Sequence, residues 1–128
     1  MFLRILDFEC SPEEISKTIG IKATKTWLKG DLISEKLAII RKQNRWELSS
    51  GIKLESDFND HLDTLLAILS PSTDKFKSLP TDYYTELACV LYMHDNESTP
   101  SVHFTKEQLT KLADLGLEID FDIYLVPN

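Results

Sequence analysis

The sequence Ser11-Pro12-Glu13-Glu14 opens an apolar run that ends at Ile19-Gly20-Ile21, and a unit of the same kind returns near the C-terminus. There, Thr105-Lys106-Glu107-Gln108 opens a run that ends at Leu115-Gly116-Leu117. Each unit begins with a hydroxyl residue and places a carboxylate or an amide three residues later, which is the pattern of a helical capping box. Each ends at a glycine, which favours helix termination. The two units therefore predict two short helices, and each adjoins an extended apolar segment, at residues 2–9 and 101–104.

Between these units the hydrophobic pattern predicts a mixture of strands and helices. Residues 22–31 form a polar loop that carries Trp27, and residues 36–41 and 45–50 predict a hairpin that turns at residues 42–44. Residues 57–69 predict a long helix, because their apolar side chains recur at the spacing of one buried face. A short helical turn follows at residues 74–79. Residues 86–94 are apolar on both faces, which is typical of a central strand. Residues 118–126 alternate, which is typical of a half-exposed strand.

The order of these elements predicts the fold. The first six run strand, helix, strand, strand, helix, strand, which is the ferredoxin-like βαββαβ order. A C-terminal β-α-β unit would extend that core. We therefore expect one α+β domain over residues 1–128, with an antiparallel or mixed sheet and its helices mainly on one face. We expect five side chains to be largely buried because each lies on the apolar face of its element, namely Leu62, Leu65, Leu91, Phe121 and Ile123.

Several short segments share their order and spacing with one bacterial family. They are Ile19-Gly20-Ile21, Ala23-Thr24-Lys25-Thr26-Trp27, Lys29-Gly30-Asp31, Trp46-Glu47-Leu48-Ser49-Ser50, His61-Leu62, Ser70-Pro71, Leu115-Gly116-Leu117 and Asp120-Phe121-Asp122-Ile123-Tyr124. In these segments, and over nearly its whole length, the chain resembles the family known as domain of unknown function 4279. The resemblance implies a single-domain, cytoplasmic bacterial protein. It implies no reaction, ligand or catalytic residue.

The charge of the chain is negative and unevenly distributed. The net charge is -7 over 128 residues. Residues 1–64 hold ten Lys and Arg against eleven Asp and Glu, whereas residues 65–128 hold four against ten. An acidic C-terminal half argues against nucleic acid as the partner, because phosphate binding needs clustered cations. It suits a basic protein partner, although the same acidity would also keep a protein without a partner soluble.

The chain shows no membrane or export signal in its sequence pattern. Its apolar stretches are too short to cross a bilayer, so we expect no membrane partner. The N-terminus has no basic segment followed by a long apolar run, so we expect no secretory signal. Cys10 and Cys89 lie in apolar segments far apart in the sequence, and we expect reduced, buried thiols in a cytoplasmic protein.

No local motif for catalysis, metal binding or phosphate binding is present in the sequence. There is no CxxC, HxxxH or HExxH pattern, so we expect no metal, no cofactor and no catalytic residue. His94 and His103 would approach each other only if their segments paired, and we interpret them as hairpin residues. We interpret His61 as a surface or boundary residue. Cys10 precedes a helix N-terminus, but we interpret it as structural.

These observations favour a non-catalytic protein-interaction module, for example an immunity or antitoxin-like protein that binds a basic toxin. The expected contacts lie in the acidic C-terminal half and comprise Asp114, Glu118, Asp120 and Asp122, with Tyr124 as an aromatic anchor. The alternative is a small-ligand-binding domain with a pocket near Trp27 and Trp46, in which Lys29 would meet an anionic group. An enzyme whose catalytic residues form no local motif is a third hypothesis.

Overall fold

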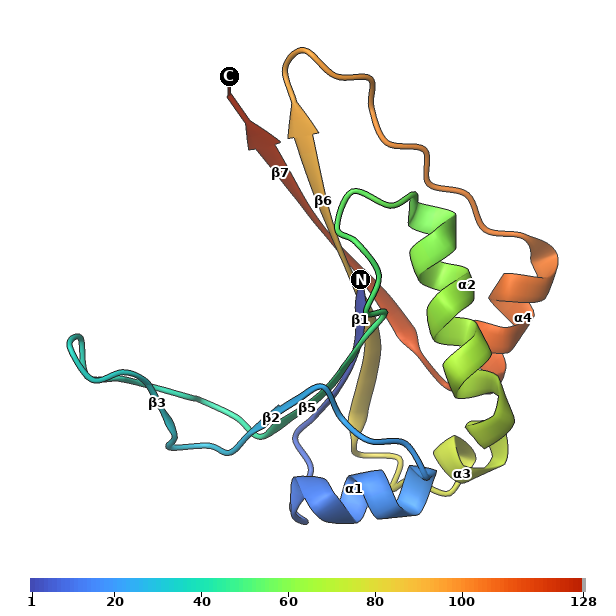
Figure 1. Cartoon of the computed structure of the whole chain (residues 1–128). Coiled ribbons are helices and arrows are strands. Elements are labelled where there is room, and N and C mark those ends of the chain that lie inside the picture. Colours follow the sequence, from blue (N-terminus) through green and yellow to red (C-terminus); the bar gives the residue numbers. More distant parts are fainter. Residues whose placement is uncertain (128) are drawn as a thin grey trace.

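Five strands form the main sheet, in the spatial order β2-β5-β1-β6-β7, and two further strands form a small separate sheet. The computed structural model describes residues 1–127 (Figure 1). The elements are β1 (Phe2–Leu6), α1 (Pro12–Ile19), β2 (Lys25–Trp27), β3 (Leu32–Ser34), β4 (Ile39–Ile40), β5 (Arg45–Ser49), α2 (Phe58–Leu69), the 3₁₀ turn η1 (Ser70–Ser72), α3 (Thr73–Lys77), β6 (Tyr84–His94), α4 (Lys106–Asp114) and β7 (Glu118–Val126).

The ferredoxin-like core is present in both strand order and strand direction. Strand β1 lies between β5 and β6 and pairs antiparallel with both, while β5 pairs antiparallel with β2. Helix α1 connects β1 to β2, and α2 to α3 connect β5 to β6, so each βαβ unit is split by a strand of the other. Helix α4 then leads to β7, which pairs parallel with β6. The predicted α+β fold with a ferredoxin-like core is therefore confirmed, and the sheet is mixed, but the C-terminal extension adds one helix and one strand, α4 and β7, instead of a complete β-α-β unit.

The two capped helices form as their sequences predict. The Ser11 hydroxyl accepts a hydrogen bond from the Glu14 backbone N–H at 3.3 Å, and α1 ends at Gly20 with φ at 72°. Thr105 and Gln108 make the full reciprocal capping box at the start of α4. Gly116 follows α4 with φ at 72°, a left-handed conformation that glycine adopts without steric cost. The segment at residues 101–104 differs from expectation because it forms no strand.

One hydrophobic core fills the space between the sheet and its helices. Strand residues alternate between the two faces of the sheet. The residues that face the helices are buried, as are the apolar stripes of α1, α2 and α4. In Figure 1, α2, α3 and α4 gather on one side of the sheet. The fully or almost fully buried side chains include Leu3, Ile5, Trp46, Leu87, Ile15, Ile19, Leu62, Leu65, Leu69 and Leu112.

The predicted hairpin in the N-terminal half is wrong. Residues 22–31 are not all loop, because β2 lies within them and forms one edge of the main sheet. Strand β4 pairs with β3 rather than with β5, so the chain turns between Ser34 and Ile39 instead of at residues 42–44. Ala38 adopts a positive φ of 51° in that turn. Residues 28–42 thus form a β-hairpin that projects from the body of the protein, and we call it the arm (Figure 1).

The predicted burial of the C-terminal strands is only partly correct. Leu62 and Leu65 are fully buried, whereas Leu91 is half-buried, and Phe121 and Ile123 are 39 % and 57 % exposed. The reason is that β1 pairs with β6 only over residues 84–88, while β6 and β7 stay paired as far as His94 and Val126. Residues 89–94 and 121–126 therefore run beyond β1 as a two-stranded segment, which we call the ribbon.

We predict that replacing Leu65 with alanine lowers the free energy of unfolding by about 2–5 kcal/mol, because it leaves a cavity in a close-packed core. Urea unfolding followed by circular dichroism measures this change. Leu54→Ala serves as the control because Leu54 is 89 % exposed, and it should change the free energy by less than about 0.5 kcal/mol. Equal effects of the two substitutions would contradict the core described here.

Candidate functional site

Strand β7 carries four of the five predicted partner-binding residues in a single row. Glu118, Asp120, Asp122 and Tyr124 alternate along the strand and therefore share one face of the sheet. Asp120 contacts Arg4 of β1, which alternates with the buried, helix-facing Leu3, so this face points away from the helices. Because β7 is the last strand of the sheet, its outer edge also carries backbone groups with no neighbouring strand.

Arg4 compensates part of the negative charge beside this row. Its guanidinium donates hydrogen bonds to buried Glu86 and, at 3.4 Å, to half-exposed Asp120. The Tyr84 hydroxyl donates to the other oxygen of Glu86 at 2.6 Å, and this bond raises the pKa of Tyr84. Within residues 1–127 neither Glu118 nor Asp122 makes an ion pair. The row therefore presents two uncompensated carboxylates and one that is shared with Arg4.

The ribbon adds exposed apolar and aromatic surface next to these carboxylates. Tyr92 and Tyr124 stack with ring centroids 5.6 Å apart and stay 59 % and 52 % exposed. On the opposite face, Ile123 and Leu125 are exposed as well. The aromatic cluster of Phe121 with residues 58 and 104 marks the last layer that the helical side of the protein covers. Beyond that layer the ribbon has exposed apolar or aromatic side chains on both faces, and Asp122 lies on the face of the tyrosine stack.

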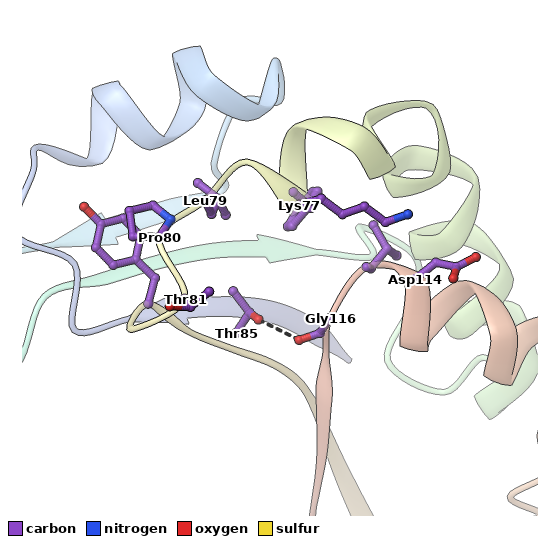
Figure 2. Close-up of a pocket in the computed structure, with 10 residues that line it drawn as sticks. Lys77, Leu79, Pro80, Thr81, Thr85, Asp114 and Gly116 are labelled. Carbon is purple, nitrogen blue, oxygen red and sulfur yellow. Dashed lines mark hydrogen bonds between the residues drawn. The ribbon is translucent and has the colours of Figure 1, made fainter.

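Asp114, the fifth predicted contact, lies apart from the row. It is at the C-terminal end of α4, where it lines a pocket of about 250 Å³. Figure 2 shows Lys77, Asp114 and Gly116 on one side of this pocket and Pro80 and Thr81 on the other, with Thr85 of β6 beside Gly116. The Thr85 hydroxyl donates a hydrogen bond to the Gly116 carbonyl oxygen at 3.0 Å. Asp114 of α4 therefore lies near the N-terminal end of β7, whereas Tyr124 lies near the C-terminal end of that strand.

The two tryptophans proposed for a ligand pocket lie on opposite faces of the sheet. Trp46 is fully buried among the core residues, and its indole N–H donates to the Ser16 hydroxyl at 2.9 Å. Trp27 is half-buried on the other face, where the guanidinium groups of Arg41 and Arg45 lie 3.9 Å and 4.7 Å from its ring centroid. The Lys29 side chain is exposed on the arm. The two indoles consequently share no pocket wall within residues 1–127.

A buried serine–histidine pair joins Ser50, the residue after β5, to His61 of α2, and sequence reasoning missed it. The Ser50 hydroxyl and His61 Nδ1 are 2.6 Å apart, and both side chains are buried. The prediction that His61 lies at the surface or at a boundary is therefore wrong. Hydroxyl–imidazole contacts of this length also occur between nucleophiles and their bases. Here the hydrogen bond connects the end of β5 to α2, so we interpret the pair as a contact that stabilises the fold.

The remaining histidines and the two cysteines form no common site in the described part of the chain. His94 ends β6, which pairs with β7 and not with the segment that carries His103. In the described part of the chain no three His, Cys, Asp or Glu side chains are placed to hold a metal ion. Cys10 and Cys89 are free thiols, and burial raises the pKa of Cys89 to about 12. Among residues 1–127 no helix combines the length and the hydropathy that crossing a membrane requires.

The comparisons with known proteins give one family. A family model described as "Domain of unknown function (DUF4279)" matches residues 1–126, which confirms the resemblance inferred from the sequence. No curated protein and no solved structure matches the chain. The family description carries no activity, so the functional argument rests on the surfaces described above.

We predict that Ser50→Ala lowers the free energy of unfolding by about 1–3 kcal/mol, because buried His61 then loses its hydrogen-bond partner. Urea unfolding at neutral pH measures this loss. Ser101→Ala is the matched control, since Ser101 is exposed and forms no hydrogen bond in the described structure. A neutral effect of Ser50→Ala would mean that the pair contributes no net stability.

We also predict that the protein loses stability as the pH falls through the pKa of an unfolded histidine, 6.5. Burial, and then the nearby positive N-terminus, lower the pKa of His61 in the folded state. Below pH 6.5 the unfolded chain therefore binds a proton at this imidazole more readily than the native state does, which favours unfolding. The stability that neutral His61 contributes to the native state is complete only above pH 6.5. The expected slope is at most about 1.4 kcal/mol per pH unit.

Unfolding of the wild type and of His61→Gln between about pH 7.5 and about pH 5.5 tests this expectation. The variant should show the shallower dependence on pH because it lacks the titrating imidazole. Parallel curves for the two proteins would rule out His61 as the source.

Proposed function

The chain belongs to the family described as domain of unknown function DUF4279, and we propose that it is a non-catalytic protein-interaction module that binds a basic partner. The single observation that carries the proposal is the row of Glu118, Asp120 and Asp122 beside the exposed Tyr92–Tyr124 stack. An immunity or antitoxin-like protein that neutralises a basic toxin is one example of such a module. We place it in the bacterial cytoplasm, a setting that two free thiols support.

The charges on β7 support a role in association. Exposed carboxylates act over about 8 Å at physiological ionic strength, so they attract a cationic surface before contact. Such steering raises association rates by about 10-fold to 1000-fold at low salt. Asp122 and Glu118 form no ion pair within residues 1–127, which makes them the stronger sources of this field. Asp120 contributes less because Arg4 is 3.4 Å away.

The aromatic pair supports a role in holding the partner. Tyrosines are enriched among the residues that dominate binding energy, because they bury a large area with few rotatable bonds. Tyr92 and Tyr124 already stack on each other, so little side-chain entropy is lost when a partner covers them. The carboxylates should therefore govern the association rate, whereas Tyr124 should govern the dissociation rate.

The small-ligand alternative has less support. Its two tryptophans lie on opposite faces of the sheet, and Trp46 is fully buried. A pocket near Trp27 alone would place the ligand against Arg41 and Arg45, which already cover the indole ring.

We predict that Asp120→Asn with Asp122→Asn slows association with a basic protein captured from the host and flattens its salt dependence. For the wild type, raising salt should lower the association rate about ten-fold or more, because screening shortens the reach of the carboxylates. Tyr124→Ala should instead raise the dissociation rate. Surface plasmon resonance at several salt concentrations separates the two rates.

The control variant carries Glu9→Gln with Glu55→Gln, which removes the same charge from exposed positions outside β7. It should keep most of the salt dependence of the wild type. An association rate that does not vary with salt, or equal losses in both double variants, would contradict the proposed role of β7.

A further inference from the structure

The arm carries a second exposed apolar surface, far from β7 in the sequence. In Figure 1 it projects away from the body of the protein, on a different side from the tip of the ribbon. Five large aliphatic side chains of the arm are between 45 % and 71 % exposed, namely Leu32, Ile33, Leu37, Ile39 and Ile40. Soluble proteins seldom expose so many aliphatic side chains on one short hairpin, and contiguous exposed patches usually mark binding surfaces.

The charge of the arm is opposite to that of the remaining chain. Residues 28–42 hold four Lys and Arg and two Asp and Glu, a net charge of +2, so the other residues sum to -9. Lys29, Lys36 and Lys42 are exposed, and they form no ion pair within residues 1–127. At the base of the arm, Arg41 and Arg45 pack against Trp27, which fixes the hairpin to the sheet.

The ribbon presents the complementary surface in the same molecule. The tyrosine stack shares one face with the carboxylates of Glu118 and Asp122, whereas Ile123 and Leu125 are exposed on the other face. An arm that lies along the outer edge of β7 can meet side chains of both faces. The arm thus matches β7 and the ribbon in two independent properties, exposed aliphatic area and opposite charge. Two arms facing each other would match in aliphatic area only, because both are basic.

We propose that the arm of a second copy of this chain occupies β7 and the ribbon, and that the exchange is reciprocal, giving a two-fold dimer. The proposal rests on the proposed function, since it names a partner for the β7 surface. In such a pair each copy donates one arm and receives one, so the same contact occurs twice and closes the assembly. The outer edge of β7 adds unpaired backbone groups that an extended segment can meet.

A charge-exchange experiment tests the proposal. The arm variant carries Lys36→Glu with Lys42→Glu, and the β7 variant carries Glu118→Lys with Asp122→Lys. All four side chains are exposed, and none forms an ion pair with another described residue, so both variants should fold as the wild type does. In a homodimer of either variant, the arm and β7 carry charges of the same sign at both contacts. The dimer dissociation constant of each variant should therefore rise about ten-fold or more.

Mixing the two variants should restore the dimer. The acidic arm of one then meets the basic β7 of the other, and the second contact in the same pair joins two unaltered surfaces. The four substitutions combined in one chain should restore the homodimer for the same reason. Sedimentation equilibrium over a concentration series measures the mass of the assembly in each sample, which is compared with the 14.7 kDa of a single chain.

Other arrangements give different results, and each overturns the proposal. An arm-to-arm dimer would lose nothing in the β7 variant. A monomeric wild type at all concentrations, or polymers that grow with concentration, would rule out reciprocal exchange. A monomeric wild type that still binds a basic host protein in a salt-dependent manner would leave the proposed function standing without this dimer.

Discussion

The antiparallel pairing of the short strand β1 with both β5 and β6 is the constraint on which the rest of the structure depends. Leu3 and Ile5 of β1 are fully buried at the centre of the sheet, where α1 and α2 pack against them. Because β1 has five residues and β6 has eleven, β6 must extend beyond its neighbour. All of β7 pairs with Glu86–His94 of β6, so the ribbon is a direct consequence of the difference in length between β1 and β6.

The same constraint explains where the exposed apolar residues lie. A buried strand needs cover on each face, and here the helices cover the sheet only as far as the layer of Phe121. The arm is exposed for a related reason, because β3 and β4 pair only with each other and not with the main sheet. Exposed strand edges invite unwanted pairing, and charged side chains on the edge are a common protection against it. Asp120 and Asp122 on β7 fit that protective role as well as a role in binding, since both roles need an exposed charge.

The sequence predicted the features that depend on local interactions. The caps at Ser11 and Thr105 are hydrogen bonds between residues three apart, so their pattern is visible in the sequence, and the order of the core elements followed from periodicity. The hairpin was misplaced because β2 has only three residues, too few for a periodic signal. The burial of Phe121 and Ile123 was misjudged because alternation shows which face a side chain occupies, but not whether another element covers that face. The Ser50–His61 pair joins residues on separate elements, and no spacing rule connects them.

The candidate site could be predicted in part for the same physical reason. Glu118, Asp120, Asp122 and Tyr124 fall in one row because a strand repeats every two residues, whereas Asp114 belongs to a helix whose direction the sequence leaves open. Neither charge nor apolar exposure alone defines a partner, since solvated carboxylates and single exposed aliphatic side chains are common on soluble proteins. The combination of charge and apolar exposure is more selective. A partner whose surface is basic but not apolar leaves Ile123 and Leu125 exposed to water, whereas a partner whose surface is apolar but has no cations must desolvate Asp122 without compensation, which costs free energy. The specificity of β7 therefore comes from the two properties lying along one strand, and the chain itself contains a hairpin that satisfies both.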